Sequence, residues 1–532
     1  MLTSSSNSPI DPKKLEKYLE GYDLEKRNYL VQGFTKGFKL EFAGEGSKKV
    51  PNNLISSARN PEVTEEKIKS ELKAGRYMGP FEHPPFENQI VSPIGLQPKK
   101  AKNKYRLITH LSYPKGKSVN DGISKDFSSV KYATVADAIK IIKKLGKGTY
   151  MAKTDIENAF RIIPLHPSQY RLLVFKFNGK YYVDKNLPMG ARSSCAIFDR
   201  FSAAIEWIMK NKLNIKHVVF ILDDFLILSK YKKKCTSQLE QFLEFCTDVG
   251  IPIAKEKTHF PNTTMEFSGI ELDSIEMMSR LPEDKISKTI AKLKEVIDGE
   301  KVTLKDLQQL TGLLNYATIV IYVGRVFIRR IYNLMIGRDN KYSKIVVKPE
   351  IKKDLKMWVE FLSTFNGKNM FMAEKWFSNS QLELFTDSAK SIGFGGYLGR
   401  KWFHGKWDIE VDKIDITTLE LYPILVAINL WGYELSNLNL LIHTDNEALV
   451  AILNNQTVKK NEKCLSLLRK FVLSCLKYNI LVKATHIKGC HNTLSDLLSR
   501  SQVARFRYLA PEMNPKPSPV PPSLSLGILL EI

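Results

Sequence analysis

Short apolar runs alternate with longer helical patterns through the first half of the chain. Between residues 76 and 280, the runs KYRLITHLS, GTYMAKTDI, RLLVFKF and HVVFILDDFLILS have the length and β-branched content of strands. The segments SSCAIFDRFSAAIEWIMK and CTSQLEQFLEFCTDVG repeat apolar residues at helical spacing. This mixture predicts an α/β or α+β domain.

A second pattern follows. Residues 281–345 are predicted to be helical, with a leucine stripe typical of core packing at Leu304, Leu307, Leu310 and Leu314. After a linker-like stretch at 346–380, the strand-like runs LELFTDSA, SIGFGGYLG and KWFHGKW precede alternating helices and strands up to residue 502, which predicts a compact mixed α/β domain. Residues 1–75 form an N-terminal lead segment, and the proline-rich tail at 503–532 is expected to be disordered or extended. We therefore predict an α+β multidomain protein.

Composition narrows the choice of partner. The 532-residue chain carries 80 Lys and Arg against 56 Asp and Glu, a formal charge of +24. Such an excess favours a polyanion, nucleic acid ahead of an anionic membrane, although a basic protein without such a partner is the plain alternative. The six cysteines form no Cys-x-x-Cys pair, and no run reaches the roughly 18 apolar residues of a membrane helix. We expect a soluble intracellular protein, nuclear or cytoplasmic, without a membrane partner.

Two adjacent acids, Asp223 and Asp224, interrupt the apolar stretch FILDDFLIL. Unpaired acids inside a buried strand are costly, so we expect a hairpin whose tight turn carries or adjoins both. Asp-Asp is a poor two-residue turn, which leaves a solvated hairpin tip or a functional site. Asp155, at the end of another strand-like run, supplies a third acid. Three carboxylates at strand ends would suit two Mg²⁺ ions about 4 Å apart, for activation of a 3′-hydroxyl and stabilisation of leaving pyrophosphate.

Four further acids recur between residues 381 and 502: Asp387, Glu420, Asp445 and Asp496. Taken singly, each fits a surface residue, and Asp445 also fits the N-cap of the helix NEALVAIL. Converging, they would suit two Mg²⁺ ions that position water for phosphodiester hydrolysis. Pro423, three residues after Glu420, is expected to disturb the helix that carries that acid unless it lies in the first turn.

Five motifs resemble, in order, the palm motifs of reverse transcriptases: DIENAF, LPMGARSSCAIF, ILDDFLI, VGIPIAKEKT and MEFSGIEL. Upstream, RLI, LSYP and SVNDGI resemble the fingers and are most similar to DIRS-type (tyrosine-recombinase) retrotransposons. The resemblance implies a right-hand polymerase, with fingers and palm over 76–280, a helical thumb over 281–345 and a connection over 346–380. It also implies dNTPs, an RNA template and a DNA primer as partners. Asp155 and Asp223 would hold two Mg²⁺, or alternatively Mn²⁺, with Asp224 as the second acid of the motif.

The same resemblance implies substrate-binding roles. Phe160 matches the aromatic gate against a ribose 2′-hydroxyl, and Met189 and Gly190 match the loop beside the nucleotide and template. Arg106 with Lys100, or a neighbour among Lys99, Lys102 and Lys104, matches the cations that grip the triphosphate. Lys257 matches a lysine that protonates leaving pyrophosphate. From the residues alone, Phe160 fits a core position and the lysines a solvated loop, and Met189 departs from the Gln or Phe of many relatives.

The four C-terminal acids resemble the ribonuclease H set in order, spacing and flanking sequence. This resemblance implies a ribonuclease H-like mixed α/β domain over 381–502, with Asp387, Glu420, Asp445 and Asp496 as its metal-binding and catalytic residues and an RNA–DNA hybrid as substrate. His491 resembles the mobile histidine of some relatives, whereas His486 is expected to pack against or orient the last strand. HIKGCH lacks the second ligand pair of a zinc site, and Ala389 in TDSA replaces the glycine of an aspartic-protease turn.

The leading interpretation is an RNA- and DNA-directed DNA polymerase with an attached ribonuclease H, active in retroelement replication. The alternative from another class is a catalytically inactive nucleic-acid-binding protein descended from such an enzyme. An enzyme that retains one of the two activities also stays open. An RNA-dependent RNA polymerase is disfavoured by Phe160 and by the second acid set.

Overall fold

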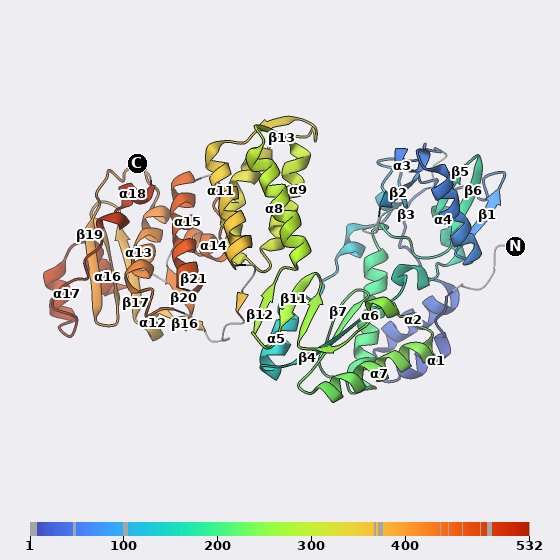
Figure 1. Ribbon diagram of the computed structural model, residues 1–532, viewed down its shortest axis with the longest axis horizontal. Coiled ribbons are helices and arrows are strands. Elements are labelled where there is room, and N and C mark those ends of the chain that lie inside the picture. The colour runs from blue at the N-terminus through green and yellow to red at the C-terminus, as the bar shows by residue number, and fades with distance from the viewer. Residues whose placement is uncertain are drawn as a thin grey trace. The chain divides into compact units, whose positions relative to one another are not determined.

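The computed structural model divides into two compact units, Met1–Ser268 with Leu272–Met277, and Gly269–Glu271 with Met278–Ile532 (Figure 1). It describes residues 8–45, 49–98, 105–365, 369–370, 376–436, 438–444, 446–459, 461–478, 480–486 and 492–530. None of the helices in these ranges is long and apolar enough to cross a membrane. The cysteines among them, Cys195, Cys235, Cys246, Cys464 and Cys475, are free thiols.

The first unit is built on a four-stranded antiparallel sheet with the order β7-β8-β4-β9. Its strands are β4 (Tyr150–Asp155), β7 (Val218–Ile221), β8 (Asp224–Ser229) and β9 (His259–Asn262). Helices α6 (Ser194–Asn211) and α7 (Lys232–Val249) pack against this sheet. Apolar residues from both layers, such as Phe225 and Phe242, are fully buried between them. The strands and helices predicted here therefore form, and they make the core that supports the first acid set.

The N-terminal segment belongs to the same core. Helices α1 (Pro12–Tyr18) and α2 (Leu24–Lys36) begin at Asp11 and Asp23, whose carboxylates accept backbone N–H bonds as N-caps. Leu15, Leu30 and Phe34 are at most 1% exposed and lie in the main apolar cluster of the first unit. Residues 8–45 thus complete this unit, although the sequence pattern there carries no chemistry.

Two smaller sheets and several helices complete the first unit. One sheet has the order β1-β6-β5, and β2 pairs with β3 in a hairpin. The elements are α3 (Ile55–Ala58), α4 (Pro61–Lys73), β1 (Tyr77–Phe81), β2 (Ile94–Pro98), β3 (Tyr105–Thr109), α5 (Val135–Leu145), β5 (Val174–Phe177), β6 (Lys180–Asp184) and β10 (Thr264–Phe267). Short 3₁₀ turns are η1 (Val119–Gly122), η2 (Lys125–Ser128), η3 (Ala159–Ile162), η4 (Pro167–Leu172) and η5 (Lys255–Lys257).

The second unit begins with a helical part. Its helices are α8 (Glu283–Asp298), α9 (Leu304–Ala317), α10 (Arg329–Met335) and α11 (Pro349–Glu360), with the turns η6 (Tyr322–Phe327) and η7 (Phe361–Phe365). The short strands are β12 (Met278–Arg280), β13 (Lys301–Thr303), β14 (Lys344–Val346) and β15 (Asn369–Met370), together with the first two residues of β11 (Ile270–Asp273), whose last two residues belong to the first unit. The four leucines of the predicted stripe are at most 1% exposed, which confirms their role in core packing. Within the stretch expected to be a linker, α11 packs on α8 because Leu355 and Trp358 are completely buried.

The C-terminal part of the second unit follows the predicted order of strands and helices (Figure 1). Strands β17 (Leu384–Ala389), β18 (Gly393–Leu398) and β19 (Lys401–Lys406) form an antiparallel sheet. Strands β16 (Trp376–Ser378), β20 (Asn439–Thr444) and β21 (Leu481–His486) pair in parallel. The helices are α12 (Asn379–Leu382), α13 (Ile416–Trp431), α14 (Glu447–Asn455), α15 (Glu462–Lys477), α16 (Thr493–Ser499), α17 (Val503–Leu509) and α18 (Leu526–Leu530), with the turn η9 (Pro522–Leu524). Helices α13 and α16 pack on β17 and β18.

The expected disturbance of the helix around Pro423 is wrong. Pro423 lies in the middle of α13, yet the helix continues from Ile416 to Trp431. Proline in a helix interior costs about 3 kcal/mol, since it removes one hydrogen bond and crowds the preceding turn. Nearly every residue from Thr418 to Ile428 is buried, and this packing outweighs the local cost.

For the described residues up to 530, the expectation of a disordered tail is wrong, although residues 517–521 form no helix or strand, as expected of an extended stretch. Phe506, Ala510 and Met513 pack with Trp402 in a separate apolar cluster. Farther on, the Tyr422 hydroxyl donates to the Leu524 carbonyl at 2.9 Å. The prolines restrict helix formation, but the apolar residues between them find partners that only the folded domain provides.

Candidate active sites

The ends of β4 and β8 bring the first three acids together. Asp155 pairs with Asp224 across the antiparallel strands, and the Ile156 N–H donates to the Asp223 carbonyl at 3.0 Å. Because Ile221 pairs with Asp224, the turn between β7 and β8 consists of Leu222 and Asp223. The hairpin predicted from FILDDFLIL therefore forms, and its turn lies beside Asp155.

The strained residue of this turn is Leu222. Its φ is 55°, while neither acid has a positive φ. Left-handed backbone costs a bulky residue about 1–2 kcal/mol, and the Leu222 side chain packs against the core of the unit in compensation. An Asp-Asp pair is compatible with the turn because the unusual conformation falls on the residue before it.

Two lysines balance the charge of the acids. Lys153, on β4, forms an ion pair with Asp224 Oδ2 at 3.2 Å, and Lys257 Nζ donates to Asp155 Oδ1 at 2.8 Å. Burial raises the pKa of Asp224 to about 6, and the charge of Lys153 opposes that rise. Burial, and then the charge of Asp155, raise the pKa of Asp223. The hydrogen bond to Asp155 raises the pKa of Lys257, which therefore stays protonated.

The donor set at these strand ends suits a hard cation. Carboxylate oxygens are the ligands that Mg²⁺ prefers, and Asp224 Oδ1 is buried without a hydrogen-bond partner. In the described part of the chain, however, no three acid, histidine or cysteine side chains are arranged to hold one metal ion. Lys153 contacts Asp224 Oδ2 and Lys257 contacts Asp155 Oδ1, so a metal ion at these acids would share the carboxylates with two ammonium groups.

A cavity of about 660 Å³ opens beside the acids and collects most of the predicted substrate-binding residues. Its lining includes Asp155, Asp223, Arg106, Phe160, Met189 and Lys257. Gly190 follows Met189 with a φ of +96°, and a side chain there would meet nothing within 4 Å, so the backbone conformation alone requires glycine. Lys100, with Lys99, Lys102 and Lys104, lies outside the described residues.

Phe160 lies where it can be both a core residue and a residue that lines the cavity. The ring is half-buried, lies 5.2 Å from the ring of Phe198 and packs against the core of the first unit. The same residue lines the cavity beside Asp155 and Asp223. One side of the ring is thus held by the core while the residue remains accessible to a ligand.

The sequence interpretation missed two residues of this site. Lys153 is one, and its position two residues before Asp155 on the same strand face was an available signal. Asn120 is the other, and it fixes the loop that carries Met189. Its amide nitrogen donates to the Gly190 carbonyl at 2.9 Å, and its oxygen accepts from the Arg192 N–H at 2.7 Å. The only sequence signal for Asn120 was its place in the motif SVNDGI. Its contact with Gly190 could not be read from local sequence, because the two residues are 70 positions apart.

The second acid set lies on elements that pack together. Asp387 is on β17, Glu420 on α13 and Asp496 on α16, and both helices contact β17. The Ser499 hydroxyl donates to Asp387 Oδ2 at 2.6 Å, which ties α16 to the strand. Asp496 is half-exposed and accepts from Arg500 at 2.8 Å. Three of the four predicted acids therefore lie on elements that pack against one another.

The fourth acid, Asp445, lies outside the described residues, as does His491. Thr444, immediately before Asp445, ends β20, and its hydroxyl donates to Glu420 Oε2 at 3.5 Å. His486 is exposed at the end of β21. Sequence reasoning also missed Ser499, three residues after Asp496 on the same helix.

The first unit is thus a mixed α/β domain whose adjoining strand ends present carboxylates to a polar cavity. Residues 97–272 match the family described as reverse transcriptase (RNA-dependent DNA polymerase). This stretch is therefore similar to the reverse transcriptase family, and the chain also matches retroviral and retroelement polyproteins.

The chain is similar to several polyproteins over part of their length. It is 25% identical over 202 residues to the Pro-Pol polyprotein of Simian foamy virus type 1, covering 38% of this chain and 16% of that protein. It is 23% identical over 409 residues to the putative enzymatic polyprotein of Cassava vein mosaic virus, and this match covers 71% of this chain and 56% of that protein. The chain thus spans between 16% and 56% of the length of these relatives.

Among solved structures, the foamy viral protease-reverse transcriptase in complex with RNA/DNA hybrid is similar in fold. The TM-score is 0.50 at 14% sequence identity, and the match covers 91% of this chain and 64% of that chain.

Proposed function

We propose that this chain is an RNA- and DNA-directed DNA polymerase that uses dNTPs, with a ribonuclease H activity carried by its C-terminal part. The observation that carries the polymerase proposal is the meeting of Asp155 and Asp223 beside the cavity that Arg106, Phe160 and Met189 line. The family match over 97–272 supports the same reaction class.

In this proposal Asp155 and Asp223 hold two Mg²⁺, or Mn²⁺, with Asp224 as a further ligand. The bound metals would supply activation of a primer 3′-hydroxyl and neutralisation of pyrophosphate. Arg106, with Lys100 or a neighbouring lysine, binds the triphosphate, and Met189 and Gly190 lie against the nucleotide and template. Phe160 excludes a ribose 2′-hydroxyl. Lys257, which lines the same cavity, would protonate the leaving pyrophosphate.

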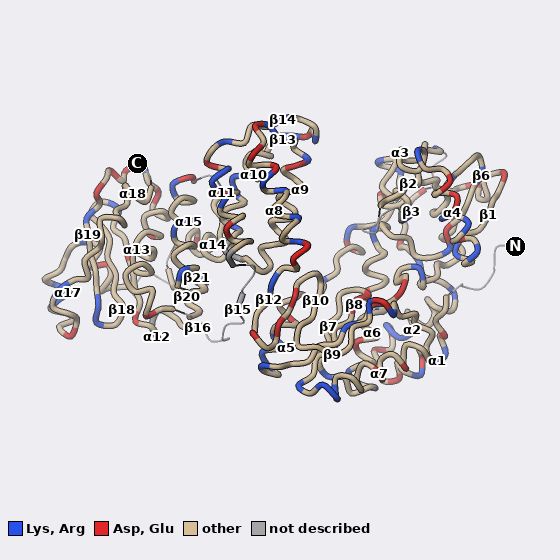
Figure 2. Tube along the Cα trace, viewed as in Figure 1, with Lys and Arg blue, Asp and Glu red and all other residues tan. Residues whose placement is uncertain are grey.

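The ribonuclease H proposal assigns Asp387, Glu420, Asp445 and Asp496 to a second pair of metals. These acids would position water for hydrolysis of the RNA strand of an RNA–DNA hybrid. Support comes from the packing of α13 and α16 on β17 and from the hydrogen bond between Ser499 and Asp387. Lys and Arg are distributed over both units, as Figure 2 shows, which supports an RNA template, a DNA primer and a hybrid as partners.

Primer extension on poly(rA)/oligo(dT) with Mg²⁺ tests the polymerase. We expect the wild-type protein to incorporate dTTP and Asp223→Asn to reduce incorporation by at least about 10³-fold, because one metal-binding carboxylate is lost. Cleavage of a labelled hybrid should survive in that variant. Asp445→Asn should abolish cleavage of the hybrid and leave dTTP incorporation intact.

A specific observation favours the inactive nucleic-acid-binding protein as the second candidate. Lysines hold Asp155 and Asp224 in ion pairs, and no described acid cluster is arranged for metal. If wild-type protein binds primer-template tightly but incorporates no dTTP with Mg²⁺ or Mn²⁺, this second candidate replaces the polymerase.

We further propose that the element of origin is of DIRS type. The sequence motifs RLI, LSYP and SVNDGI support this assignment. Two of these motifs meet in the fold, since Asn120 of SVNDGI contacts Ser112 of LSYP. Sequencing of the flanking DNA tests it. A tyrosine-recombinase reading frame is expected, and an integrase frame in its place would contradict the assignment.

A further inference from the structure

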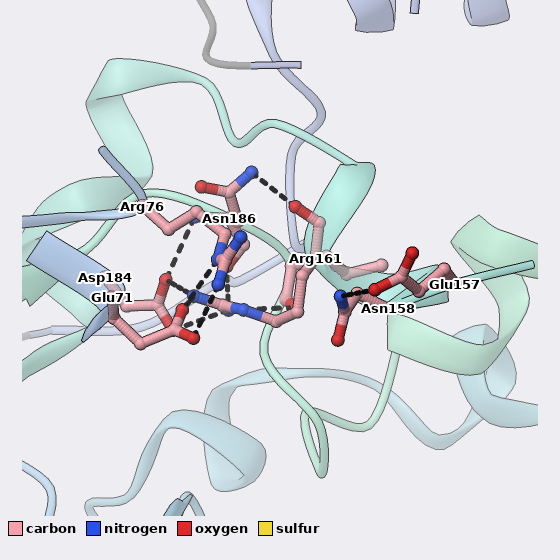
Figure 3. A network of polar contacts seen from close by, with 8 residues as sticks. Glu71, Arg76, Glu157, Asn158, Arg161, Asp184 and Asn186 are labelled. Carbon is pink, nitrogen blue, oxygen red and sulfur yellow. Dashed lines mark hydrogen bonds and ion pairs between the residues drawn. The ribbon is translucent and has the colours of Figure 1, made fainter. Parts of the chain in front are cut away.

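A charged network lies beside the nucleotide-sized cavity of the first unit, where Glu71, Arg76, Arg161 and Asp184 form linked ion pairs (Figure 3). Glu71 comes from α4, Arg161 from η3 and Asp184 from the end of β6. Glu71, Arg161 and Asp184 also line the cavity that contains Asp155, Asp223 and Phe160. The network therefore borders the proposed nucleotide site without any of the proposed metal ligands.

Arg161 is the centre of this network. Its two terminal nitrogens donate to both carboxylate oxygens of Asp184, each at 2.9 Å, and one of them also donates to Glu71 at 3.0 Å. The side chains of Arg161 and Asp184 are only 13% and 9% exposed. Burial is the largest single effect and lowers the pKa of Arg161, but the charges of Asp184 and Glu71 and the hydrogen bonds to Asp184 contribute to a combined effect that raises it. A planar guanidinium makes this bidentate contact, and a lysine cannot.

The same residue takes part in the contact between two neighbouring segments, 161–163 and 186–187. Asn186 Nδ2 donates to the Arg161 carbonyl at 2.9 Å, and the Leu187 N–H donates to the Ile163 carbonyl at 2.9 Å. The Arg161 guanidinium also reaches the Leu187 carbonyl at 3.4 Å. The turn that carries Phe160 is thereby fixed to the segment that leads into Met189.

We propose that Arg161 is a positioning residue for nucleotide selection. Arg161 directly follows Phe160, so a rotation of η3 moves the gate ring together with the guanidinium. By holding Asp184 and the segment 186–187, Arg161 sets the width of the cavity between Phe160 and Met189. The inference rests on the polymerase function proposed above and adds a residue that does not touch the reacting atoms.

Arg161→Met, which keeps an unbranched apolar stem and removes the guanidinium, tests the inference in primer extension. We expect the ratio of kcat/KM for dTTP over UTP to fall about 10-fold to 100-fold, mainly through a higher KM for dTTP, because a displaced gate fits the deoxyribose less closely. Arg161→Lys should not restore selectivity. Arg76→Met is the matched control, since Arg76 binds the same Glu71 but its side chain contacts neither gate segment. Selectivity of that control should stay at the wild-type level.

Amide hydrogen exchange gives a readout that needs no activity. Exchange in 159–163 and 184–190 should rise about tenfold or more in Arg161→Met and stay unchanged in Arg76→Met. Unchanged exchange in Arg161→Met overturns the inference. If exchange rises in Arg161→Met as expected but the wild-type protein incorporates no dTTP, the polymerase proposal is contradicted. Arg161 then only holds the two segments together.

A double variant covers the case in which Arg161→Met does not fold. Arg161→Met with Asp184→Leu removes both charges, and replacement of a whole buried pair by apolar residues is often tolerated. This protein should fold and still lose dTTP selectivity. Wild-type selectivity in the folded double variant would refute the positioning role.

Discussion

Lys153 and Asp224 show how single side chains set the properties of the first acid set. Their side chains are 18% and 19% exposed, so neither charge is well solvated. The ion pair does not fully offset burial, since the pKa of Asp224 is still raised to about 6. Asp224 thus costs stability at neutral pH, and such a cost at a strand end is typical of a residue kept for function.

This cost predicts a pH dependence of stability in metal-free protein. The ordinary pKa of 3.8 rises to about 6 on folding, so between these values the folded state keeps a proton that the unfolded chain has lost. The free energy of unfolding should therefore fall as pH rises from about 3 to about 7, by about 3 kcal/mol in all from this group. Asp224→Asn should lack this fall.

Urea unfolding in EDTA at several pH values measures the effect. Trp207 is the single tryptophan between residues 1 and 277, so 5-fluorotryptophan labelling reports on the first unit, with Trp207→Phe to assign the signal. Parallel profiles for the wild-type protein and Asp224→Asn would contradict the prediction.

Phe160 allows a second test at this scale. Replacement by Val removes the part of the ring that would contact a ribose 2′-hydroxyl, and incorporation of UTP relative to dTTP should rise about tenfold or more. Competition between the two nucleotides in primer extension measures the ratio. Equal ratios in the variant and the wild type would refute the gate assignment.

At the scale of elements, α16 lies directly on the backbone of β18. A Cβ at Gly395 would meet Leu498 Cβ at 2.4 Å and the Ser499 nitrogen at 3.0 Å. The helix carries Asp496 and Ser499, and Ser499 binds Asp387. The close approach therefore holds two predicted acids of the second set on neighbouring elements.

Gly395→Ala should displace α16 and reduce hybrid cleavage about 10-fold to 100-fold, because small displacements of catalytic groups have effects of that size. Primer extension should continue. Gly312→Ala on α9, where a side chain would meet nothing within 4 Å, is the control and should leave cleavage intact. Normal cleavage by folded Gly395→Ala would show that the contact does not position the acids.

At the scale of the whole molecule, the formal charge of +24 governs affinity for nucleic acid. A protein that contacts 6–10 phosphates loses about 10³-fold to 10⁵-fold in affinity between 50 and 200 mM salt. We expect a loss of this size for primer-template, measured by fluorescence anisotropy in NaCl. Asp223→Asn removes no cation and should have the same slope. A flat salt dependence would contradict electrostatic binding.

The sequence by itself determined the identity and order of most elements. Period-two runs and helical stripes are local, so β4, β7, β8, α6 and α7 formed where the pattern predicted them. The cost of burying Asp223 and Asp224 predicted a hairpin at that point, and the turn is there. Chain order also predicted three strands before the alternating elements of the C-terminal part.

Tertiary structure alone decided which residues meet. Asp155 adjoins Asp223 because β4 pairs with β8, and Asn120 reaches Gly190 across 70 residues of sequence. Pro423 stays inside a helix and the proline-rich tail packs because distant apolar partners stabilise both against their local preferences. Sequence patterns report the preferences of neighbouring residues, whereas these contacts depend on burial and pairing between segments far apart in the chain.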